Sequence, residues 1–227
     1  GLLDDLMGLS QKTKAILPFF FSLHLGVFVP SIMFIPLIGS IDFGSLMIIM
    51  VPIGITCASN SANMLEGFNG LGTGLGLIIT TTLIIISIIN NSVEGLYLLI
   101  PLLGTLIAFL YYNKYPAKIF PGDTLTLFVG ATICCAAIIN NLKLEGVLLM
   151  SPMIVEFFLK WRGNFKGECF ANSSENGILV YEGRIESLTH LAMLKFKLSE
   201  KTLVYMFWIF ETVLAVLLIT LSIYDII

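Results

Sequence analysis

The chain has 227 residues, of which 57% are hydrophobic and only 12% are charged, and its mean hydropathy is +0.96. A soluble globular domain carries about 25% charged residues, so this composition excludes an ordinary soluble domain. The formal net charge of −3 gives no basic surface that would suggest a nucleic-acid partner. The long continuous apolar runs also argue against a transmembrane β-barrel, whose strands alternate apolar and polar residues.

Apolar runs of about 15–24 residues recur along the chain, which predicts an all-α, polytopic transmembrane helical bundle. The predicted spans, about seven, are 15–38, 44–59, 72–89, 96–111, 124–139, 146–160 and 203–224. The first run is too long and too embedded in this pattern to be a signal peptide. The segment 161–202 is predicted to be a cytoplasmic loop insertion with a small β-hairpin and an amphipathic helix, within one integral-membrane domain of residues 1–227.

Basic residues lie almost entirely on one side of this predicted topology. Very short connections alternate with longer polar ones, and seven spans place the two sets on opposite faces of the membrane. The longer connections are 1–14, 60–71, 112–123 and 161–202. Lys143 is the one Lys or Arg residue that falls on the other side. The positive-inside rule therefore predicts that the longer connections are cytoplasmic.

Several isolated residues have reactive side chains but are predicted to be structural. The cysteines show no CxxC or Cys/His spacing, so neither a disulfide framework nor a zinc site is expected; they are Cys57, Cys134, Cys135 and Cys169. His24 is expected to be a hydrogen-bonded packing histidine in the first span, and His190 to lie on the surface. Glu156 and Glu211 fall within spans, where pairing or snorkelling near a span end, as Lys160 would allow for Glu156, is favoured over a relay role.

Three polar segments adjoin span ends on the predicted cytoplasmic side. They read GLLDDLMGLSQKTK (1–14), NSANMLEGFNG (60–70) and NKYPAKIFPGDTLTLFVGA (113–131). Carboxylate and amide oxygens are hard ligands that suit Mg²⁺, which takes one or two protein carboxylates plus substrate phosphates. The lysines beside them suit phosphate charge. Together the segments predict a magnesium and phosphate site at the cytoplasmic membrane surface.

Asp123 and the nearby glycines each have a structural alternative. Asp123 follows Pro121 and Gly122 directly before an apolar span, which is the position of a helix N-cap. An ionisable group at such a depth is otherwise a functional candidate. The glycines at 72, 74 and 76 either let the backbone approach a ligand or pack helices together. Glu66 has no assigned role.

The same three segments resemble motifs of the polyprenyl-phosphate N-acetylhexosamine-1-phosphate transferases, and most nearly those of the dolichyl-phosphate N-acetylglucosamine phosphotransferases. Residues 1–5 resemble G-F-x-D-D, with Lys14 and Pro18 at the family's spacing beyond it. Residues 60–71 resemble N-A-x-N-x-x-x-G-x-N-G-L, and residues 113–124 resemble N-x-Y-P-x-x-x-F-x-G-D-T. The likeness covers most of the chain. Because members of this family carry additional spans before the double-Asp element, the chain is expected to be the C-terminal portion of a longer protein.

The resemblance implies a reaction and a role for each matching residue. The reaction is Mg²⁺-dependent transfer of N-acetylglucosamine-1-phosphate from UDP-N-acetylglucosamine to a polyprenyl or dolichyl phosphate, which releases UMP and starts glycan assembly, as in N-glycosylation. The implied metal ligands are Asn63 and Asp123, with Mn²⁺ as an alternative ion. The implied catalytic residues are Asp4, Asp5, Lys14 and Asp123. The implied substrate-binding residues are Asn69, Gly70, Leu71, Phe120, Lys114, Arg162 and Lys166.

In this proposed arrangement, Asn69, Gly70 and Leu71 would contact the uracil, and Phe120 would stack near it. Lys14 would bind phosphate, and the paired aspartates would sit beside the attacking lipid phosphate. The family's His-x-His-like element is not evident; Lys160, Arg162 and Lys166 occupy the equivalent region, which leaves recognition of the sugar open.

Several alternatives stay open from the sequence. Direct attack by the lipid phosphate is favoured over a covalent aspartyl-phosphate route. A phospho-MurNAc-pentapeptide transferase or another UDP-sugar-1-phosphate transferase is a second enzyme hypothesis, and a membrane transporter is the hypothesis from a different class. A structural membrane subunit would not need three such motifs. The Ile-rich spans favour an archaeal plasma membrane over an endoplasmic reticulum membrane, and a homodimer is an open alternative.

Overall fold

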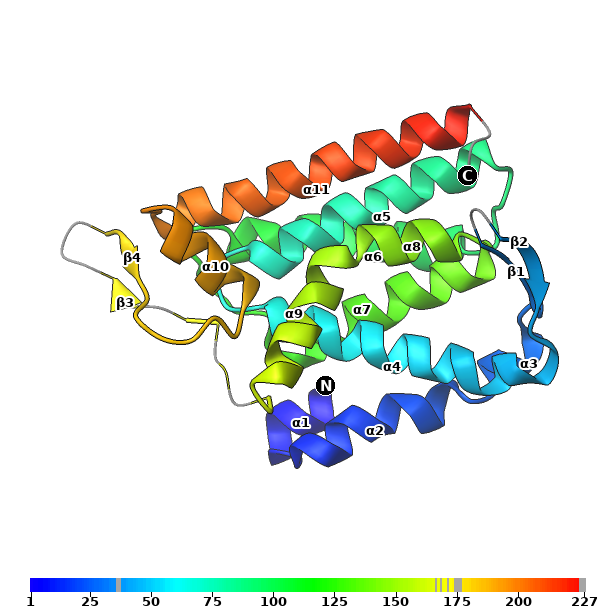
Figure 1. Cartoon of the computed structure of the whole chain (residues 1–227), viewed down its shortest axis with the longest axis horizontal. Coiled ribbons are helices and arrows are strands. Elements are labelled where there is room, and N and C mark those ends of the chain that lie inside the picture. Colours follow the sequence, from blue (N-terminus) through cyan, green and yellow to red (C-terminus); the bar gives the residue numbers. More distant parts are fainter. Residues whose placement is uncertain (36–37, 166, 168, 171, 174–176, 225–227) are drawn as a thin grey trace.

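The computed structural model describes residues 1–35, 38–165, 167, 169–170, 172–173 and 177–224, and in this part the chain is a helical bundle with small hairpins at its edges (Figure 1). The longer helices are α2 (Gln11–Ser22), α4 (Met47–Leu65), α5 (Leu71–Ile89), α6 (Leu96–Asn113), α7 (Gly122–Ile139), α9 (Ser151–Arg162) and α11 (Glu200–Ile223). The shorter elements are α1 (Leu2–Met7), α3 (Leu25–Phe28), η1 (Gly44–Leu46), α8 (Lys143–Leu149), α10 (Leu188–Lys195), β1 (Ile32–Ile35), β2 (Gly39–Asp42), β3 (Asn172–Ser173) and β4 (Leu179–Val180).

Five helices in the described part of the chain are long and apolar enough to cross a membrane. They are Gly44–Leu65, Leu71–Ile89, Leu96–Asn113, Gly122–Ile139 and Glu200–Ile223. The polytopic helical class predicted from the sequence is therefore confirmed, and five of the seven predicted spans appear as single helices of membrane length. The runs 15–38 and 146–160 do not form single membrane-length helices.

The run 15–38 is divided into two short helices and a strand. Helix α2 ends at Ser22, whose hydroxyl donates to the carbonyl of Pro18 at 2.6 Å. Helix α3 ends at Val29, which is extended (φ −88°, ψ 139°), as expected for a residue that precedes a proline. The chain then forms the antiparallel pair β1–β2, in which Ile32 faces Asp42.

The run 146–160 bends at Met150, where α8 ends and α9 begins (Figure 1). Pro152 occupies the first turn of α9, where its missing N–H costs nothing. The same missing N–H prevents a continuous ladder of hydrogen bonds from α8 into α9. Two short helices therefore replace the predicted straight span.

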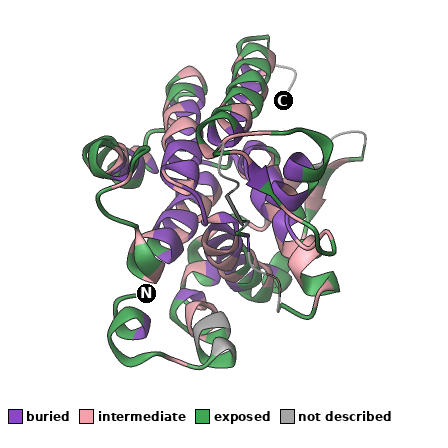
Figure 2. Ribbon diagram, turned by 90° about the vertical axis from the view of Figure 1, so that its left-hand side faces the viewer, coloured by how far each residue is buried: buried purple, intermediate pink, exposed green. Residues whose placement is uncertain are grey.

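The centre of the bundle is the close contact between α4 and α7. A Cβ atom on Gly130 of α7 would collide with the carbonyl of Ala58 and lie 2.8 Å from the Cβ of Ala62, so only glycine permits this approach. The Ser59 hydroxyl donates to the Leu127 carbonyl across the same contact, at 2.8 Å. Figure 2 shows buried residues on the inner faces of the central helices and exposed residues on the outer helices.

The helices place the connections of the chain at two opposite ends of the bundle (Figure 1). At one end, called here the site end, lie α1 and the connections 66–70 and 114–121. At the other, called here the outer end, lie the β1–β2 hairpin and the connections 90–95 and 140–142. The three polar segments found in the sequence therefore share one end.

The loop insertion contains the predicted hairpin and the predicted helix. Strands β3 and β4 are antiparallel, with Ser173 facing Leu179. Helix α10 packs on α9 and α11 and buries Thr189, His190, Ala192 and Met193. His190 is only 1% exposed, so the predicted surface position of this residue is wrong. His24 is the reverse case: it is exposed, and not the predicted packing histidine.

Candidate active site

Asp5 of α1 caps the first turn of α7. One carboxylate oxygen accepts from the Asp123 N–H at 3.0 Å, and the other accepts from the Thr124 N–H at 2.9 Å and from the Thr124 hydroxyl. The Thr124 hydroxyl, followed by the backbone donors, holds the pKa of the Asp5 carboxyl below its ordinary value. Asp123 lies inside the helix that begins at Gly122, so the structural alternative of Asp123 as its N-cap is excluded. A carboxylate from another helix takes that role.

Asp4 is 7% exposed and closes the turn that follows α1. Its carboxylate Oδ1 accepts from the Leu9 N–H at 2.8 Å, and its carbonyl accepts from Gly8 at 2.8 Å. The two neighbouring aspartates therefore face different partners. Asp4 fixes the path from α1 to α2, while Asp5 joins α1 to α7.

Asn63, in the last turn of α4, contacts α7 through Thr126. The Thr126 hydroxyl donates to Asn63 Oδ1 at 2.8 Å and also lies 3.1 Å from the carbonyl of Gly122. The two predicted metal ligands, Asn63 and Asp123, are thus carried by the helix pair that packs most closely in the bundle. The rigid α4–α7 contact sets their relative position.

Asn113 is a residue of this end that the sequence analysis did not single out for a role. It is fully buried, and its Oδ1 accepts from the Thr73 hydroxyl at 2.8 Å. Its amide donates to the Ile119 carbonyl at 3.0 Å, which fixes the connection that leads to Phe120 and Asp123. The phenyl ring of Phe120 is 55% exposed at the start of α7. Asn113, the first residue of the third motif, therefore holds the connection 114–121 in place from the buried side.

Asn69 joins three segments of the site end. Its backbone N–H donates to Glu200 Oε1 at 2.8 Å, and its side-chain amide donates to the same oxygen. Its Oδ1 accepts from the Ala117 N–H at 3.0 Å. Gly70 follows in the left-handed region (φ +78°) as the N-cap of α5, and Leu71 is fully buried. The Asn69 carboxamide thus already holds the connections before α5 and α7 against the start of α11.

Glu66, which the sequence left without a role, lies against the first turn of α5. Its carboxylate packs on Gly72, where an added Cβ would collide with the carboxylate in its present position, and lines a small cavity with Thr73 and Thr126. Neither carboxylate oxygen has a hydrogen-bond partner in the described part of the chain. Burial raises the pKa of Glu66 to about 8. Gly72 is therefore a packing glycine that makes room for a buried acid.

The predicted phosphate and sugar contacts are spread around the site end. Lys114 ends α6, and its ammonium lies 5.3 Å from the centre of the Tyr111 ring. The Arg162 guanidinium, at the end of α9, donates to the Ile185 carbonyl. Lys14 lies in the first turn of α2, but its side chain is outside the described part, and Lys166 falls wholly outside the described residues. Lys114 and Arg162, the two whose side chains are described, contact different segments.

Glu156 attaches the loop insertion to the bundle. It is fully buried on α9, accepts from the Ser187 hydroxyl at 3.0 Å and the Leu188 N–H at 2.7 Å, and lies 3.7 Å from the ammonium of Lys160. The predicted pairing with Lys160 is therefore confirmed. His190, beside this network, stacks on Tyr181 with the ring centres 3.6 Å apart.

The described residues contain no group of three or more His, Cys, Asp or Glu side chains that could hold a metal ion by themselves. A metal at this end would need amide and substrate oxygens in addition to a carboxylate. Mg²⁺ is bound in that manner, with few protein carboxylates and several oxygens from substrate or water. The donor set of Asn63 and Asp123 therefore fits Mg²⁺ better than zinc.

Fold and site together define a polytopic helical membrane protein with a carboxylate- and amide-rich site at one end of its bundle. The family model described as glycosyl transferase family 4 matches residues 1–141, which include all three polar segments. The chain belongs to glycosyl transferase family 4.

Relatives of the chain have named activities. A protein of Saccharolobus solfataricus, provisionally named a UDP-N-acetylglucosamine–dolichyl-phosphate N-acetylglucosaminephosphotransferase, is 39% identical over 98% of this chain and 70% of its own length. A Dictyostelium discoideum protein of the same named activity is 33% identical over 69% of this chain and 47% of its own length. A phospho-N-acetylmuramoyl-pentapeptide-transferase of Borrelia duttonii is 35% identical over 56% of this chain and 41% of its own length.

Proposed function

We propose that the chain carries the catalytic site of an enzyme that transfers N-acetylglucosamine-1-phosphate from UDP-N-acetylglucosamine to a polyprenyl or dolichyl phosphate and releases UMP. The observation that carries the proposal is the convergence of the three polar segments on α7. Asp5 caps this helix beside Asp123, and Asn63 contacts it at Thr126. Relatives of similar sequence along nearly the whole chain are named for this activity.

The transfer forms a bond between an oxygen of the lipid phosphate and the sugar-bearing phosphorus, and it breaks the bond from that phosphorus to UMP. A phosphate monoester has a second pKa near 6, so the attacking lipid phosphate is already largely dianionic at pH 7. The site needs positioning and positive charge more than a strong base. Direct attack is therefore the mechanism that we propose.

Each predicted residue has a part in this proposal. Asn63 and Asp123 would hold Mg²⁺, or Mn²⁺ in its place, which when bound would neutralise diphosphate charge. Asp5 orders the first turn of α7 and so sets the position of Asp123. Lys14 would bind phosphate. Phe120 would stack near the uracil, next to the connection that Asn69 holds in place.

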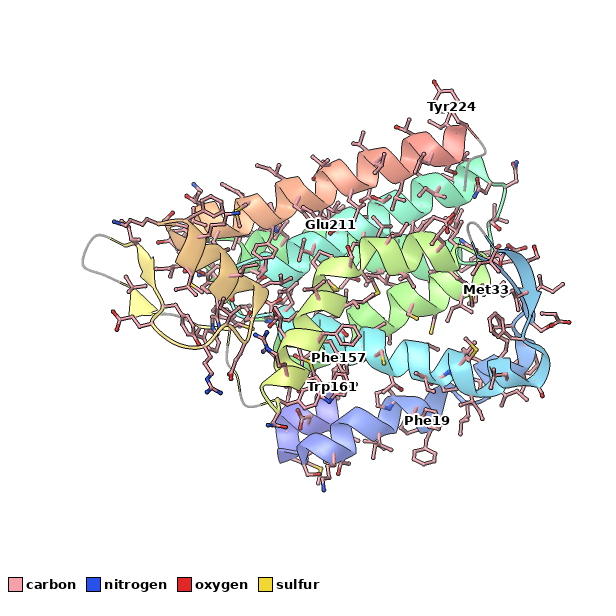
Figure 3. The ribbon with its side chains drawn as sticks, in the orientation of Figure 1. Phe19, Met33, Phe157, Trp161, Glu211 and Tyr224 are labelled. Atoms are coloured by element: carbon pink, nitrogen blue, oxygen red, sulfur yellow. The ribbon has the colours of Figure 1, made fainter. Side chains whose placement is uncertain are left out.

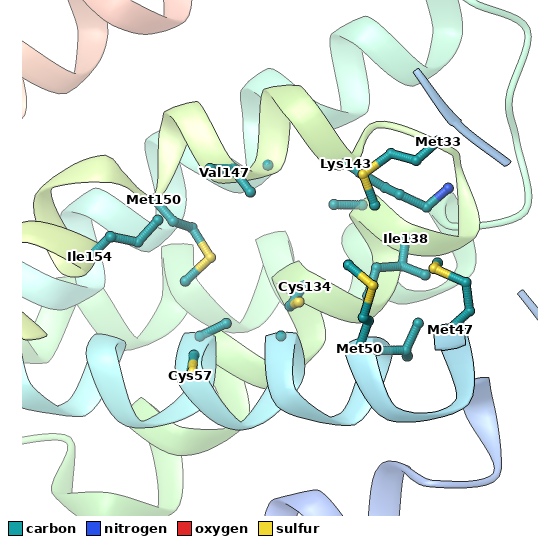
Figure 4. A pocket seen from close by; sticks show the side chains of 15 residues that line it. Met33, Met47, Met50, Cys57, Cys134, Ile138, Lys143, Val147, Met150 and Ile154 are labelled. Carbon is teal, nitrogen blue, oxygen red and sulfur yellow. The ribbon is translucent and has the colours of Figure 1, made fainter. Parts of the chain in front are cut away.

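An apolar cavity provides space for the lipid tail. It has a volume of about 320 Å³ and lies between α4, α7 and the α8–α9 pair (Figure 4). Its walls include Met47, Met50, Val51, Cys134 and Ile154, and Lys143 is the charged residue among those that line it in the described part. Flexible methionine side chains suit an irregular hydrocarbon ligand. We propose that the isoprenoid chain of the acceptor occupies this cavity.

The proposed orientation puts the site end in the cytoplasm, where UDP-sugars are made, and the outer end on the far side of an archaeal plasma membrane. The basic residues gathered at the site end support this orientation. A homodimer stays a prediction from the sequence.

The test is UMP release by the chain in membranes with Mg²⁺, a lipid phosphate and a panel of UDP-sugars. We expect release with UDP-N-acetylglucosamine, and we expect Asp123→Asn and Asn63→Ala to lower its rate about 100-fold or more, the usual effect of removing a group that stabilises transition-state charge. Glu94→Gln, an exposed position at the outer end, is the matched control and should keep the rate.

Other outcomes would point elsewhere. UMP release only with UDP-MurNAc-pentapeptide would support the second enzyme hypothesis, a phospho-MurNAc-pentapeptide transferase, which is the named activity of the Borrelia duttonii relative. Full rates in both site variants would contradict the metal assignment. Flux of a substrate across liposomes, without UMP release from any UDP-sugar, would favour the transporter hypothesis.

A further inference from the structure

A second pocket lies at the site end, between the starts of α5 and α11 and the end of α6. It has a volume of about 330 Å³, and its lining includes Lys114, Tyr115, Lys201, Tyr205 and Trp208. Asn69 and Lys114 of the implied substrate-binding set line it, whereas none of Asp4, Asp5, Asn63 and Asp123 does so in the described part of the chain. We call it the α6–α11 pocket.

Two lysines of the α6–α11 pocket have no ion-pair partner among the described residues. Lys114 lies over the ring of Tyr111 at 5.3 Å, and Lys201 lies over the ring of Tyr205 at 5.7 Å. The carboxylate next to Lys201, that of Glu200, is engaged by Asn69. The pocket therefore has two positive charges and no protein carboxylate lining it, which favours an anionic ligand.

The α6–α11 pocket lies where two candidate membrane spans end. Both α6 and α11 are long and apolar enough to cross the membrane. Tyr111, Tyr112 and Tyr205 are exposed near their site-end turns, which is the composition of an interfacial aromatic belt. Farther along the same helices, Ile107 and Ile209 are exposed at 56% and 64%. The polar head of a lipid would therefore lie beside the tyrosines, and its apolar chains would lie beside the exposed isoleucines.

The α6–α11 pocket offers little to read a nucleobase. The Asn69 carboxamide, in its wall, already uses its oxygen on Ala117 and its amide on Glu200. The indole N–H of Trp208 lies 3.4 Å from the Leu71 carbonyl, to which it donates. The pocket groups that have no hydrogen-bond partner among the described residues are ammonium ions and phenol hydroxyls, and these bind phosphate oxygens.

We propose that the α6–α11 pocket binds the phosphate headgroup of an anionic membrane phospholipid, whose chains lie along the exposed apolar sides of α6 and α11. The bound lipid would brace the ends of α5, α6 and α11, and hence the connection that contains Asn69. The proposal does not depend on the transferase reaction, because its test measures lipid binding and not UMP release.

Trp208 is a built-in reporter of this pocket, since the chain has two tryptophans and the other, Trp161, lies at the end of α9, away from α11 (Figure 3). In a Trp161→Phe variant of the full chain, brominated phosphatidylglycerol and brominated phosphatidylcholine are titrated into detergent micelles. We expect phosphatidylglycerol to quench Trp208 fluorescence at a lower mole fraction.

Lys201→Gln in the same background should weaken the preference for phosphatidylglycerol about five-fold, the usual contribution of one lysine at an anionic surface. Lys197→Gln, an exposed lysine outside the pocket, is the matched control and should keep the preference. Equal quenching by both lipids, or an equal loss in both lysine variants, would overturn the proposal.

Two soluble competitors distinguish the other ligands with phosphate groups. Inorganic phosphate and UDP are each added at millimolar concentration to the phosphatidylglycerol-quenched protein. We expect neither to restore Trp208 fluorescence. Restoration by phosphate would show a site for a free anion, and restoration by UDP would show a nucleotide pocket; either result would overturn the lipid assignment.

Discussion

Acidic side chains lie at the starts of three helices of the site end, where each meets a different need. Asp5 accepts from the first turn of α7, Glu66 packs on the first turn of α5, and Glu200, the first residue of α11, accepts from Asn69. The exposed N–H groups and the dipole of a helix favour negative charge at its N-terminus. Asp5 has donors in the first turn of α7 that favour its ionised form, and Glu200 accepts from Asn69. Glu66 makes no hydrogen bond of normal geometry among the described residues, and burial favours its neutral form.

The buried carboxyl of Glu66 leads to a pH prediction. Its pKa is raised by burial from 4.5 to about 8. The folded chain therefore keeps this proton to higher pH than the unfolded chain, and folding stability falls as pH rises from about 4.5 to 8 and then levels off. Glu66→Gln cannot ionise, so its stability relative to the parent chain should increase by a few kcal/mol between pH 5 and pH 8.5.

Thermal unfolding in detergent at the two pH values measures this difference. Glu94→Gln, an exposed acid at the outer end, serves as the control and should show a much smaller change between pH 5 and pH 8.5. A Glu66→Gln variant whose melting temperature differs from the parent by the same amount at both pH values would contradict the assignment of a buried, protonated carboxyl.

At the scale of elements, the α4–α7 pair is the framework on which the site is built. Small residues on both helices, among them Ala58, Ala62 and Gly130, bring the backbones close together. Close backbone approach at small residues is the usual way in which membrane helices associate. The contact also carries Asn63 and Asp123, so its geometry is transmitted to the site.

We expect Gly130→Ala to destabilise the protein by about 1–3 kcal/mol, the usual cost of overpacking, because the added methyl would collide with the Ala58 backbone. UMP release should fall with it, because the two helices must move apart. Gly104→Ala is the matched control on α6, where a Cβ meets no atom within 4 Å, and should be neutral or slightly stabilising. Melting temperatures and rates for the two variants measure the contrast; equal melting temperatures would contradict the proposed packing.

At the scale of the whole molecule, polar contacts fix both ends of an apolar bundle. At the outer end the fully enclosed Asn140 accepts from the Gly95 N–H at 2.5 Å and donates to the Ser87 hydroxyl at 2.6 Å, which joins α7 to α5 and α6. Ser222 of α11 donates to Asn90 of the same end at 3.0 Å. Glu211 has no such partner in the described part and lies on the side of α11 that faces α5 (Figure 3).

The two ends should lie on opposite sides of the membrane. In a chain without its four native cysteines, Glu94→Cys reports the outer end and Lys197→Cys reports the site end; both positions are exposed. We expect a membrane-impermeant maleimide added to intact cells to label position 94, and to label position 197 only after permeabilisation. Labelling of both positions from outside would contradict the proposed orientation.

The class of fold and the segments that form the site could be predicted from the amino-acid sequence. Continuous apolar runs can hardly form anything but membrane helices, and five of the predicted spans appear as such helices. The three polar segments were recognisable because polar residues are costly in such a chain. Hydrophobicity alone predicted one continuous helix for each of the runs 15–38 and 146–160, whereas each run is divided into shorter elements. The apolar pattern does not show where a proline or a hydroxyl group ends a helix.

The contacts between individual side chains, in contrast, follow from the way the helices pack and could not be predicted from the sequence. The N-cap of α7 comes from Asp5, 118 residues away in the chain, so no local pattern around Asp123 could identify it. The burial of His190, the link from Asn69 to Glu200 and the placement of Glu66 over Gly72 likewise depend on helices that are distant in sequence. The composition of a segment sets the free energy of placing that segment in the membrane. Contacts between segments depend on how the helices pack against one another, and the composition of a single segment does not predict this packing.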